Sequence, residues 1–328
     1  MLYLSLFGHL SVAKCDGPAP WPAVDLTGRP GGLLAYLALA KGRFFTRSEL
    51  VTTLWPDQAE GSSVRSLNTA LWRLRTALQR PPLEHRELVL CDRGGAVGLP
   101  AHAALQIDVA EFARLVTPGL NQPMEQLDAS HIEQLRRGVS LYRDDILAGF
   151  TDDWALRARE VHRRMHLNAL GRLMQLSSFA QDYGGAIRYA QEILDRDPLR
   201  EDVHRELMRL FLLNGQRAMA LRQFEQCRAA LRKELAIQPM RETLAVYQRI
   251  ADGAVARSSE PPAAPVNALP QDGWVRRSQD RRCGAVSDLA KLSAQQLVSS
   301  ARGYLAQADA HLQQSLPLFE GLVASAPR

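Results

Sequence analysis

The most chemically suggestive part of the sequence is an arginine-rich stretch that lacks acidic residues. Residues 61–83 contain no Asp or Glu, and their arginines are Arg65, Arg73, Arg75 and Arg80. A guanidinium group is a planar fork of donors that can bridge phosphate oxygens or the O6 and N7 edge of guanine. Asn, Gln and Thr side chains in the same stretch can add polar contacts. These residue types suit contact with a nucleic-acid duplex.

A helical pattern divides this stretch into two faces. The apolar residues recur at helical spacing, which predicts a stripe that faces a core: Val64, Leu67, Leu71, Leu74 and Leu78. The opposite face and its flanks carry the predicted DNA contacts: Asn68, Thr69, Trp72, Arg73 and Thr76 toward the bases, with Arg65, Arg75 and Arg80 nearer the phosphates. A solvated basic helix that binds no partner has the same pattern. The neighbouring segments are therefore needed to distinguish a DNA-binding helix from a solvated one.

The segments before the basic helix predict two further helices. Residues 31–40 are almost wholly apolar, and Thr46 and Glu49 have the spacing of a capping box that opens a second helix ending near Trp55. A polar stretch, 57–63, then leads to the basic helix, with Ser62 or Ser63 as its N-cap. The predicted order is helix, helix, loop and recognition helix.

Strand patterns flank these helices. Residues 87–99 predict two short strands around an Asp-Arg-Gly-Gly turn, which would form a wing. Residues 2–13 alternate apolar and polar side chains, and prolines at 18–22 interrupt the chain before 24–26. We therefore expect a small N-terminal sheet.

At this point the sequence resembles the winged helix-turn-helix of response-regulator effector domains, in the version found in Streptomyces antibiotic regulatory proteins. The resemblance rests on LYLSLFGHLSV, FFTRSELVTTLWP and RSLNTALWRLRTAL, followed by LYRDDILAGFTDDW, RDPLREDVHRELMRLFLLNGQRAMAL and RKELAIQPMRETLAVYQRI. The last three segments are similar to the bacterial transcriptional activator domain of that family. The matches cover about residues 1–252 in the family's order.

The second region also shows an internal repeat. Residues recur at an offset of 34, the tetratricopeptide period: Leu173-Met174 as Leu207-Met208, Ala186 as Ala220, and Ala190 as Phe224. Flanking helices near 109–116, 130–142 and 243–250 would cap the array, with Asp108 and residues 128–130 as helix starts. The expected fold is mostly α with a small β component. A winged helix-turn-helix over 1–101 precedes an α-helical, tetratricopeptide-like domain over 105–252.

The resemblance also implies a function. A regulator of this family is expected to bind double-stranded DNA at direct repeats near a promoter, as a homodimer on DNA, and to contact RNA polymerase holoenzyme through the winged helix and the loop 57–63. The residues themselves do not distinguish an activator from a repressor. The competing hypothesis is an interaction scaffold whose helical repeats do the work and whose winged helix binds protein.

Composition is consistent with the DNA-binding hypothesis. The formal net charge is +5 and the pI is about 9.2. Residues 1–100 hold eleven Lys and Arg against eight Asp and Glu, and 63–80 alone hold four arginines and no acid. A concentration of positive charge on one helix attracts the phosphates of DNA, and this attraction makes DNA binding sensitive to salt.

Motifs of other function classes are missing from the sequence. It has no phosphate-binding Gly-x-x-x-x-Gly-Lys loop, no Gly-x-Ser-x-Gly elbow and no His-Glu-x-x-His helix. The four cysteines are scattered and no apolar run is long enough for a membrane span. We expect a cytoplasmic non-enzyme without a cofactor, metal or membrane partner.

Several further residues have two interpretations. Arg93 at the wing tip would enter a minor groove or remain a solvated turn residue. Thr46, Arg47 and Ser48 would hold a phosphate at a helix N-terminus, although Thr46 as a plain cap is the simpler role. His162 and His166 lie one turn apart, and their surroundings predict a solvated helix face in place of a metal site. Trp55 and Trp154 are expected in the core.

The C-terminal part changes in composition. Residues 253–284 are rich in Pro, Ala and Ser and predict a linker. Leucines recur at roughly helical intervals through 285–328, which predicts an amphipathic helical or partly disordered tail. No function follows from this segment.

Overall fold

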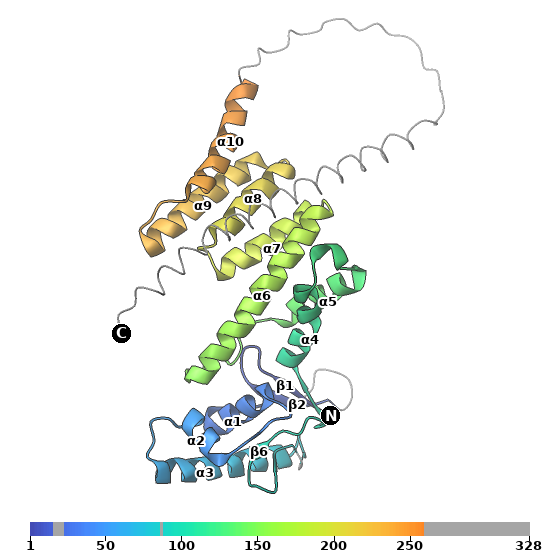
Figure 1. The fold of residues 1–328 in the computed structure, drawn as a ribbon, viewed down its shortest axis with the longest axis vertical. Helices are drawn as coiled ribbons and strands as arrows, with labels where there is room; N and C mark the ends of the chain where they lie inside the picture. The colour runs from blue at the N-terminus through green and yellow to red at the C-terminus, as the bar shows by residue number, and fades with distance from the viewer. Residues whose placement is uncertain (16–22, 86–87, 259–328) are drawn as a thin grey trace, which may run out of the picture. The chain divides into compact units, whose positions relative to one another are not determined.

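A computed structural model describes residues 1–15, 23–85 and 88–258, and this part of the chain is mainly helical (Figure 1). The described residues all belong to one compact unit, Met1–Pro261. The mostly α fold with a small β component is confirmed. No helix among the described residues is long and apolar enough to cross a membrane.

The N-terminal sheet has four strands. They are β1 (Leu2–Ser5), β2 (Ser11–Lys14), β3 (Ala23–Asp25) and β7 (Leu105–Ile107), in the order β3-β2-β1-β7. β1 pairs antiparallel with β2 and parallel with β7, with Leu2 opposite Leu105. The sequence did not predict β7. It lies at the start of the segment assigned to the second domain, so residues from that segment complete the first sheet.

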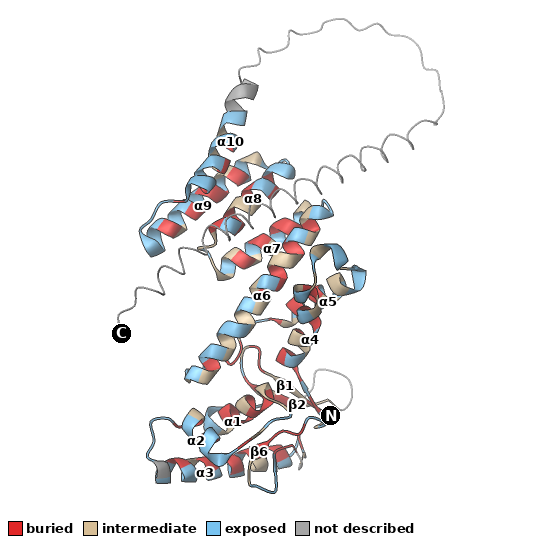
Figure 2. Cartoon of the chain, viewed as in Figure 1, coloured by how far each residue is buried: buried red, intermediate tan, exposed pale blue. Residues whose placement is uncertain are grey.

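Three helices pack beside this sheet, α1 (Gly28–Leu39), α2 (Arg47–Leu54) and α3 (Glu60–Gln79). Their contacts with one another enclose a leucine core: Leu33, Leu34, Leu37, Leu50, Leu67 and Leu74, all fully buried. α3 therefore presents its apolar stripe to α1 and α2, as the periodicity predicts (Figure 2).

Two details of α3 differ from the prediction. The helix begins at Glu60 with Ala59 as N-cap, so Ser62 and Ser63 lie inside it and neither is the cap. Their backbone N–H groups donate to the Ala59 carbonyl, which extends the helix through the expected loop. Val64 is 40% exposed, whereas Ser63 is buried. At about 100° per residue Val64 lies roughly 70° from the centre of the buried stripe, at its edge.

The wing is a three-stranded sheet, β4 (Phe44–Phe45), β6 (Val97–Gly98) and β5 (Leu90–Cys91), in that order. The predicted hairpin is confirmed as β5 and β6, although each strand has only two residues. β4 comes from the segment before α2 and was not predicted. It links the base of the wing to the helices.

The helical region begins with α4 (Asp108–Asn121), the short 3-10 helix η1 (Met124–Gln126) and α5 (Ala129–Leu141). The array continues with α6 (Asp153–Phe179), α7 (Tyr183–Arg196), α8 (Glu201–Leu213), α9 (Arg217–Leu235) and α10 (Arg241–Ser258), in which sequence neighbours from α6 to α9 pack side by side (Figure 1). The helix α10 runs through 253–258, so the predicted linker does not begin at 253. The rest of the linker and the tail 285–328 lie outside the described residues.

The offset of 34 relates the helix pair α6–α7 to α8–α9. Leu173 and Leu207 are buried at matching positions, as are Ala186 and Ala220. The turns match as well, because Gln181 and Gly215, also 34 apart, both adopt positive φ angles of 61° and 74°. The repeat is therefore expressed in backbone geometry as well as in packing.

Asp108 joins the sheet to the helical region. Its buried carboxylate accepts hydrogen bonds from the backbone N–H groups of Leu6 and Phe7 at 2.9 and 3.0 Å. Burial raises the pKa of this carboxyl, and those hydrogen bonds oppose the shift. Asp108 is the first residue of α4 rather than its N-cap, whereas Asp128 caps α5 by accepting from the His131 N–H. The two expected helix starts thus have different roles.

The burial of His166 and of Trp154 differs from the prediction. His166 is fully buried, so the predicted solvated face is wrong for it; its ring stacks on Tyr142 at 4.0 Å. Phe112 of α4 and Glu192 of α7 also lie beside the ring, at 6.3 Å between ring centroids and 3.4 Å from Nε2. Trp55 is buried at 3% exposure, but Trp154 is only half-buried. The described residues contain no cluster of metal-ligating side chains.

Acidification is expected to destabilise the fold through His166. Burial lowers the pKa of this imidazole, and Glu192 at 3.4 Å offsets only part of the shift. Below the ordinary value of 6.5 the unfolded chain takes up a proton that the folded chain resists, so the free energy of unfolding falls as pH decreases from about 6.5. Urea denaturation at several pH values measures this. His166→Phe should flatten the dependence, and exposed His102→Phe should leave it unchanged; equal slopes in both variants would contradict the assignment.

Candidate nucleic-acid interface

The solvent-facing side of α3 carries most of the predicted contacts. The exposed members are Arg65, Asn68, Thr69, Trp72, Arg73 and Arg80, while Arg75 and Thr76 are half-buried at its flank. Trp72 is 66% exposed, which is unusual for so large an aromatic side chain. A helix of 20 residues spans about 30 Å, long enough to lie along a duplex groove.

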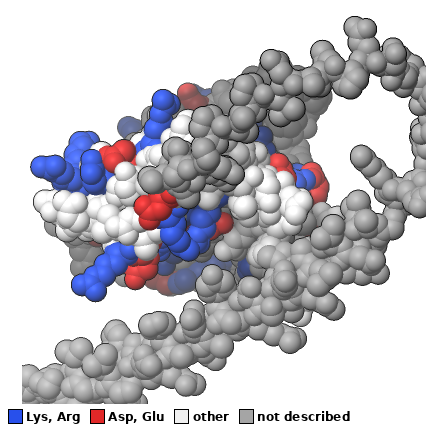
Figure 3. All heavy atoms as spheres, turned by 90° about the horizontal axis from the view of Figure 1, so that it is seen from above, with Lys and Arg blue, Asp and Glu red and all other residues white. Residues whose placement is uncertain are grey.

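The exposed arginines of this face have no acidic neighbour in the part of the chain that the structure describes, a property that some exposed arginines elsewhere, such as Arg136 and Arg157, share. Among the described residues no carboxylate lies within ion-pair distance of Arg65, Arg73 or Arg80. Several other exposed arginines pair with nearby acids: Arg114 with Glu111, Arg200 with Asp202, Arg209 with Glu206, and Arg228 with Glu225. In Figure 3, seen from above, Lys and Arg lie interspersed with Asp and Glu on the visible described surface. The charge on α3 is therefore left for an external anion.

One contact joins the N-terminus of α2 to α3. The Arg47 guanidinium donates to Asn68 Oδ1 at 2.6 Å, although the residues are 21 positions apart. The contact fixes the orientation of the Asn68 amide. The NH2 group of Asn68 can still donate a hydrogen bond, and Oδ1 can accept one more. Two residues predicted separately for DNA contact are therefore neighbours on one surface.

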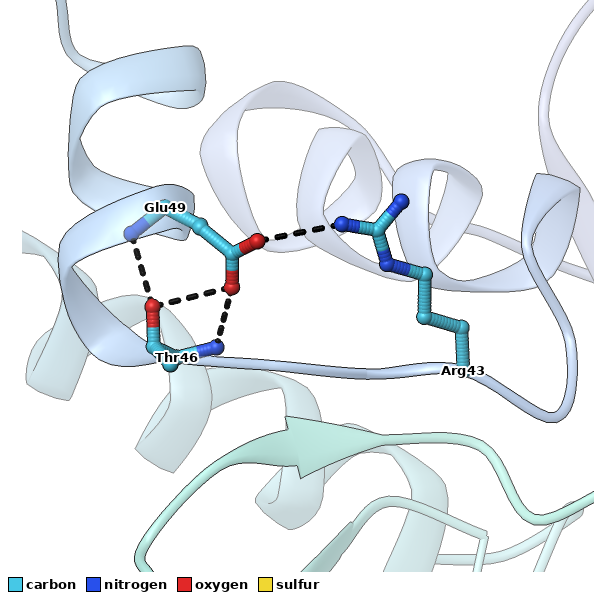
Figure 4. A network of polar contacts seen from close by, with 3 residues as sticks. All are labelled: Arg43, Thr46 and Glu49. Carbon is cyan, nitrogen blue, oxygen red and sulfur yellow. Dashed lines mark hydrogen bonds and ion pairs between the residues drawn. The ribbon is translucent and has the colours of Figure 1, made fainter.

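The N-terminus of α2 is closed by a complete capping box (Figure 4). Glu49 N–H donates to Thr46 Oγ1 at 3.2 Å, and the Glu49 carboxylate accepts from Thr46 N at 2.7 Å. The Thr46 hydroxyl also donates to this carboxylate at 2.9 Å, and the two hydrogen bonds from Thr46, with Arg43 at 3.0 Å, lower the pKa of Glu49. Thr46 is thus the cap, as its spacing predicts, and a carboxylate already occupies its N–H. Arg47 and Ser48 remain exposed beside it.

Arg75 supports the wing. Its guanidinium donates to the Val89 carbonyl at 3.4 Å and to Cys91 Sγ at 3.3 Å. These contacts tie the C-terminal half of α3 to β5, an arrangement that helical periodicity cannot reveal. A phosphate contact by Arg75 would compete with them.

Arg93 lies exposed in the turn between β5 and β6. Asp92 shapes this turn, because its carboxylate accepts from the N–H groups of Gly94 and Ala96 at 2.9 and 2.8 Å. Gly95 adopts φ 82°, a conformation that favours glycine. The turn holds Arg93 at the tip of the wing.

Two residues that sequence reasoning missed help to position this surface. Gln58 accepts from the Ser66 hydroxyl at 2.9 Å and thereby braces the turn before α3. Arg43 packs over the Phe45 ring at 4.5 Å and adds an exposed cation near α2. A polar residue in a pre-helix turn and an arginine beside an aromatic strand are weak sequence signals, which explains the omission.

Comparison with known proteins identifies both parts of the chain. Residues 22–95 match the family "Transcriptional regulatory protein, C terminal", and residues 107–251 match the "Bacterial transcriptional activator domain". Regulatory protein AfsR of Streptomyces coelicolor is 27% identical over 238 residues, which cover 71% of this chain and 23% of AfsR. The chain belongs to the Streptomyces antibiotic regulatory protein (SARP) type of transcriptional regulator.

A second curated relative and one solved structure also match this SARP-type regulator over part of their length. AfsR of Streptomyces griseus is 24% identical over 233 residues, or 70% of this chain and 23% of AfsR. The chain thus spans 23% of the length of each of these curated relatives. A structure of Mycobacterium tuberculosis EmbR in complex with a low affinity phosphopeptide shares the fold, with a TM-score of 0.59 and 17% identity, over 77% of this chain and 65% of that one.

Proposed function

We propose that this SARP-type regulator binds DNA sequence-specifically by placing the exposed face of α3 in a major groove. The observation that carries the proposal is the set of arginines on α3 without acidic partners, on the same face as Asn68 and Thr69. Arginine and asparagine are the side chains best suited to read guanine and adenine in that groove. In this arrangement Arg93, at the tip of the wing that Arg75 holds, would contact an adjacent backbone or minor groove.

We assign the residues of this surface to two roles. Asn68, Thr69, Trp72, Arg73 and Thr76 face the bases, and Arg65, Arg80, Arg93 and the α2 residues Arg47 and Ser48 face the phosphates. Thr46 caps α2 and positions Arg47 and Ser48. The Arg75 contacts with the wing make it a positioning residue in this arrangement. The division follows from position on the helix, because the central residues reach deepest into a groove.

The proposed regulatory outcome is activation. Binding of two copies at direct repeats near a promoter would bring the helical domain, residues 105–252, beside RNA polymerase holoenzyme in the cytoplasm. The turn before α3, residues 55–59, is shorter than the expected loop 57–63 and is exposed beyond Trp55. It remains available for a protein contact next to the DNA.

A salt titration tests the DNA-binding step. Fluorescence anisotropy with a labelled random duplex should show binding at low salt, with log K falling against log salt at a slope of about −4, since each neutralised phosphate contributes about −0.9 and Arg47, Arg65, Arg80 and Arg93 supply four contacts. Arg65→Ala should reduce the slope by about 1.

The control is Arg228→Ala, which removes an exposed arginine that is paired with Glu225 on α9. It should leave affinity and slope unchanged. If the wild-type chain did not bind the random duplex at low salt, the helical repeats would become the functional element and the scaffold hypothesis would replace this one.

A further inference from the structure

A cavity of ≈ 340 Å³ lies between the winged-helix part and the start of the helical repeats. One wall comes from the β2–β3 sheet edge and α1 and includes Leu10, Leu26 and Thr27. The other comes from residues 149–154 and includes Phe150 and Trp154. The volume falls near the lower end of the range of small-molecule sites, about 300–1,000 Å³. None of the residues proposed to contact DNA lines it.

Direct contacts hold the two walls together. Arg29 Nη1 donates to the Leu54 carbonyl at 2.6 Å and to Asp152 Oδ1 at 2.7 Å, which joins α1 to the start of α6. The rings of Tyr36 and Trp154 meet edge to face at 5.4 Å. The cavity is therefore formed before any ligand arrives, which reduces the ordering cost of binding.

The charges around the cavity nearly cancel. Its side chains carry the carboxylates of Asp25 and Asp152 and the guanidinium of Arg29, a formal sum of −1 for these three groups. The N-termini of α1 and α6 also reach it, and neither is capped by a side chain. Each helix N-terminus acts as roughly half a positive charge, so the total is about zero. This balance favours an uncharged ligand over an anion or a cation.

Aromatic surface defines the remaining chemistry of the cavity. Phe150 and Trp154 offer ring faces and edges for stacking. The indole Nε1 of Trp154 has almost no accessible surface, so a ligand in the cavity contacts the ring of Trp154 and not its N–H.

We propose that this cavity binds a small uncharged aromatic molecule. The ligand stacks on the ring of Phe150 or Trp154. Because it would contact both α1 and the start of α6, it would stabilise the junction between the DNA-binding part and the repeats. This binding does not require DNA and is measured without it.

Naphthol is a suitable probe, with naphthoate and naphthylmethylammonium as matched charged analogues at neutral pH. NMR of the isotope-labelled full chain follows the Trp154 indole N–H signal, which is identified by its loss in Trp154→Phe. Naphthol should shift this signal saturably, and both charged analogues should bind more weakly. No saturable shift with any probe, or tighter binding of a charged analogue, would overturn the proposal.

A cavity-filling variant locates the site. Thr27 is exposed, lines the cavity and makes no side-chain cap hydrogen bond, so Thr27→Phe narrows the cavity without removing a helix cap. It should weaken naphthol binding by at least about tenfold, which corresponds to about 1.4 kcal/mol. Thr117→Phe, at an exposed position of α4 outside the cavity, should leave binding unchanged. Equal binding by both variants would place the probe elsewhere and refute the site, and circular dichroism confirms that both are folded.

Discussion

Arg73→Ala is expected to weaken binding to the preferred duplex by about 1–3 kcal/mol. Arg73 lies exposed near the middle of α3 and has no acidic partner among the described residues, so the guanidinium is free to pair with a base. The preferred duplexes are obtained by selection from a random library with the wild-type chain, and affinities are measured by gel-shift titration at fixed salt.

The base contact can be separated from simple charge loss. A residue that reads a base should relax specificity at one position of the selected site, whereas Arg65→Ala should weaken all duplexes alike. Arg228→Ala, on α9, controls for the removal of an arginine elsewhere. Unchanged affinity and unchanged selection in Arg73→Ala would remove this residue from the base-reading set.

Phe112→Ala is expected to lower the free energy of unfolding by about 3–5 kcal/mol, because it leaves a cavity in a close-packed core. Phe112 of α4 is fully buried, and its ring lies 5.5 Å from Phe7 and 5.8 Å from Tyr142. The ring thus joins the end of the N-terminal sheet to α5. Urea denaturation followed by circular dichroism measures the change.

Phe179→Ala is the matched control for this core substitution. Phe179 ends α6 and is 64% exposed, so the same truncation should cost within about 0.5 kcal/mol. If Phe112→Ala cost no more than Phe179→Ala, the sheet and the helical region would not share the core described here.

The interface proposed here was only partly predictable from sequence. The position of the arginines on α3 follows from the helical period, and the Thr46 cap follows from the spacing to Glu49. The Arg47–Asn68 and Arg75–Cys91 contacts join separate elements, and no local pattern encodes which arginine will turn toward the wing. The start of α3 was also misplaced, because a Gly/Ser stretch that favours a loop by propensity is helical when the helix packs on α1 and α2.

The sequence by itself determined the features that depend on short-range periodicity. These are the amphipathic helix α3, the capping box and the wing turn, each set by contacts between near neighbours along the chain, together with the recurrence of residues at an offset of 34. Tertiary structure alone decided the pairing of β1 with β7, the burial of His166 against Tyr142 and the cavity beside Arg29. Each of these joins residues far apart in sequence, and their meeting depends on how whole helices and strands pack.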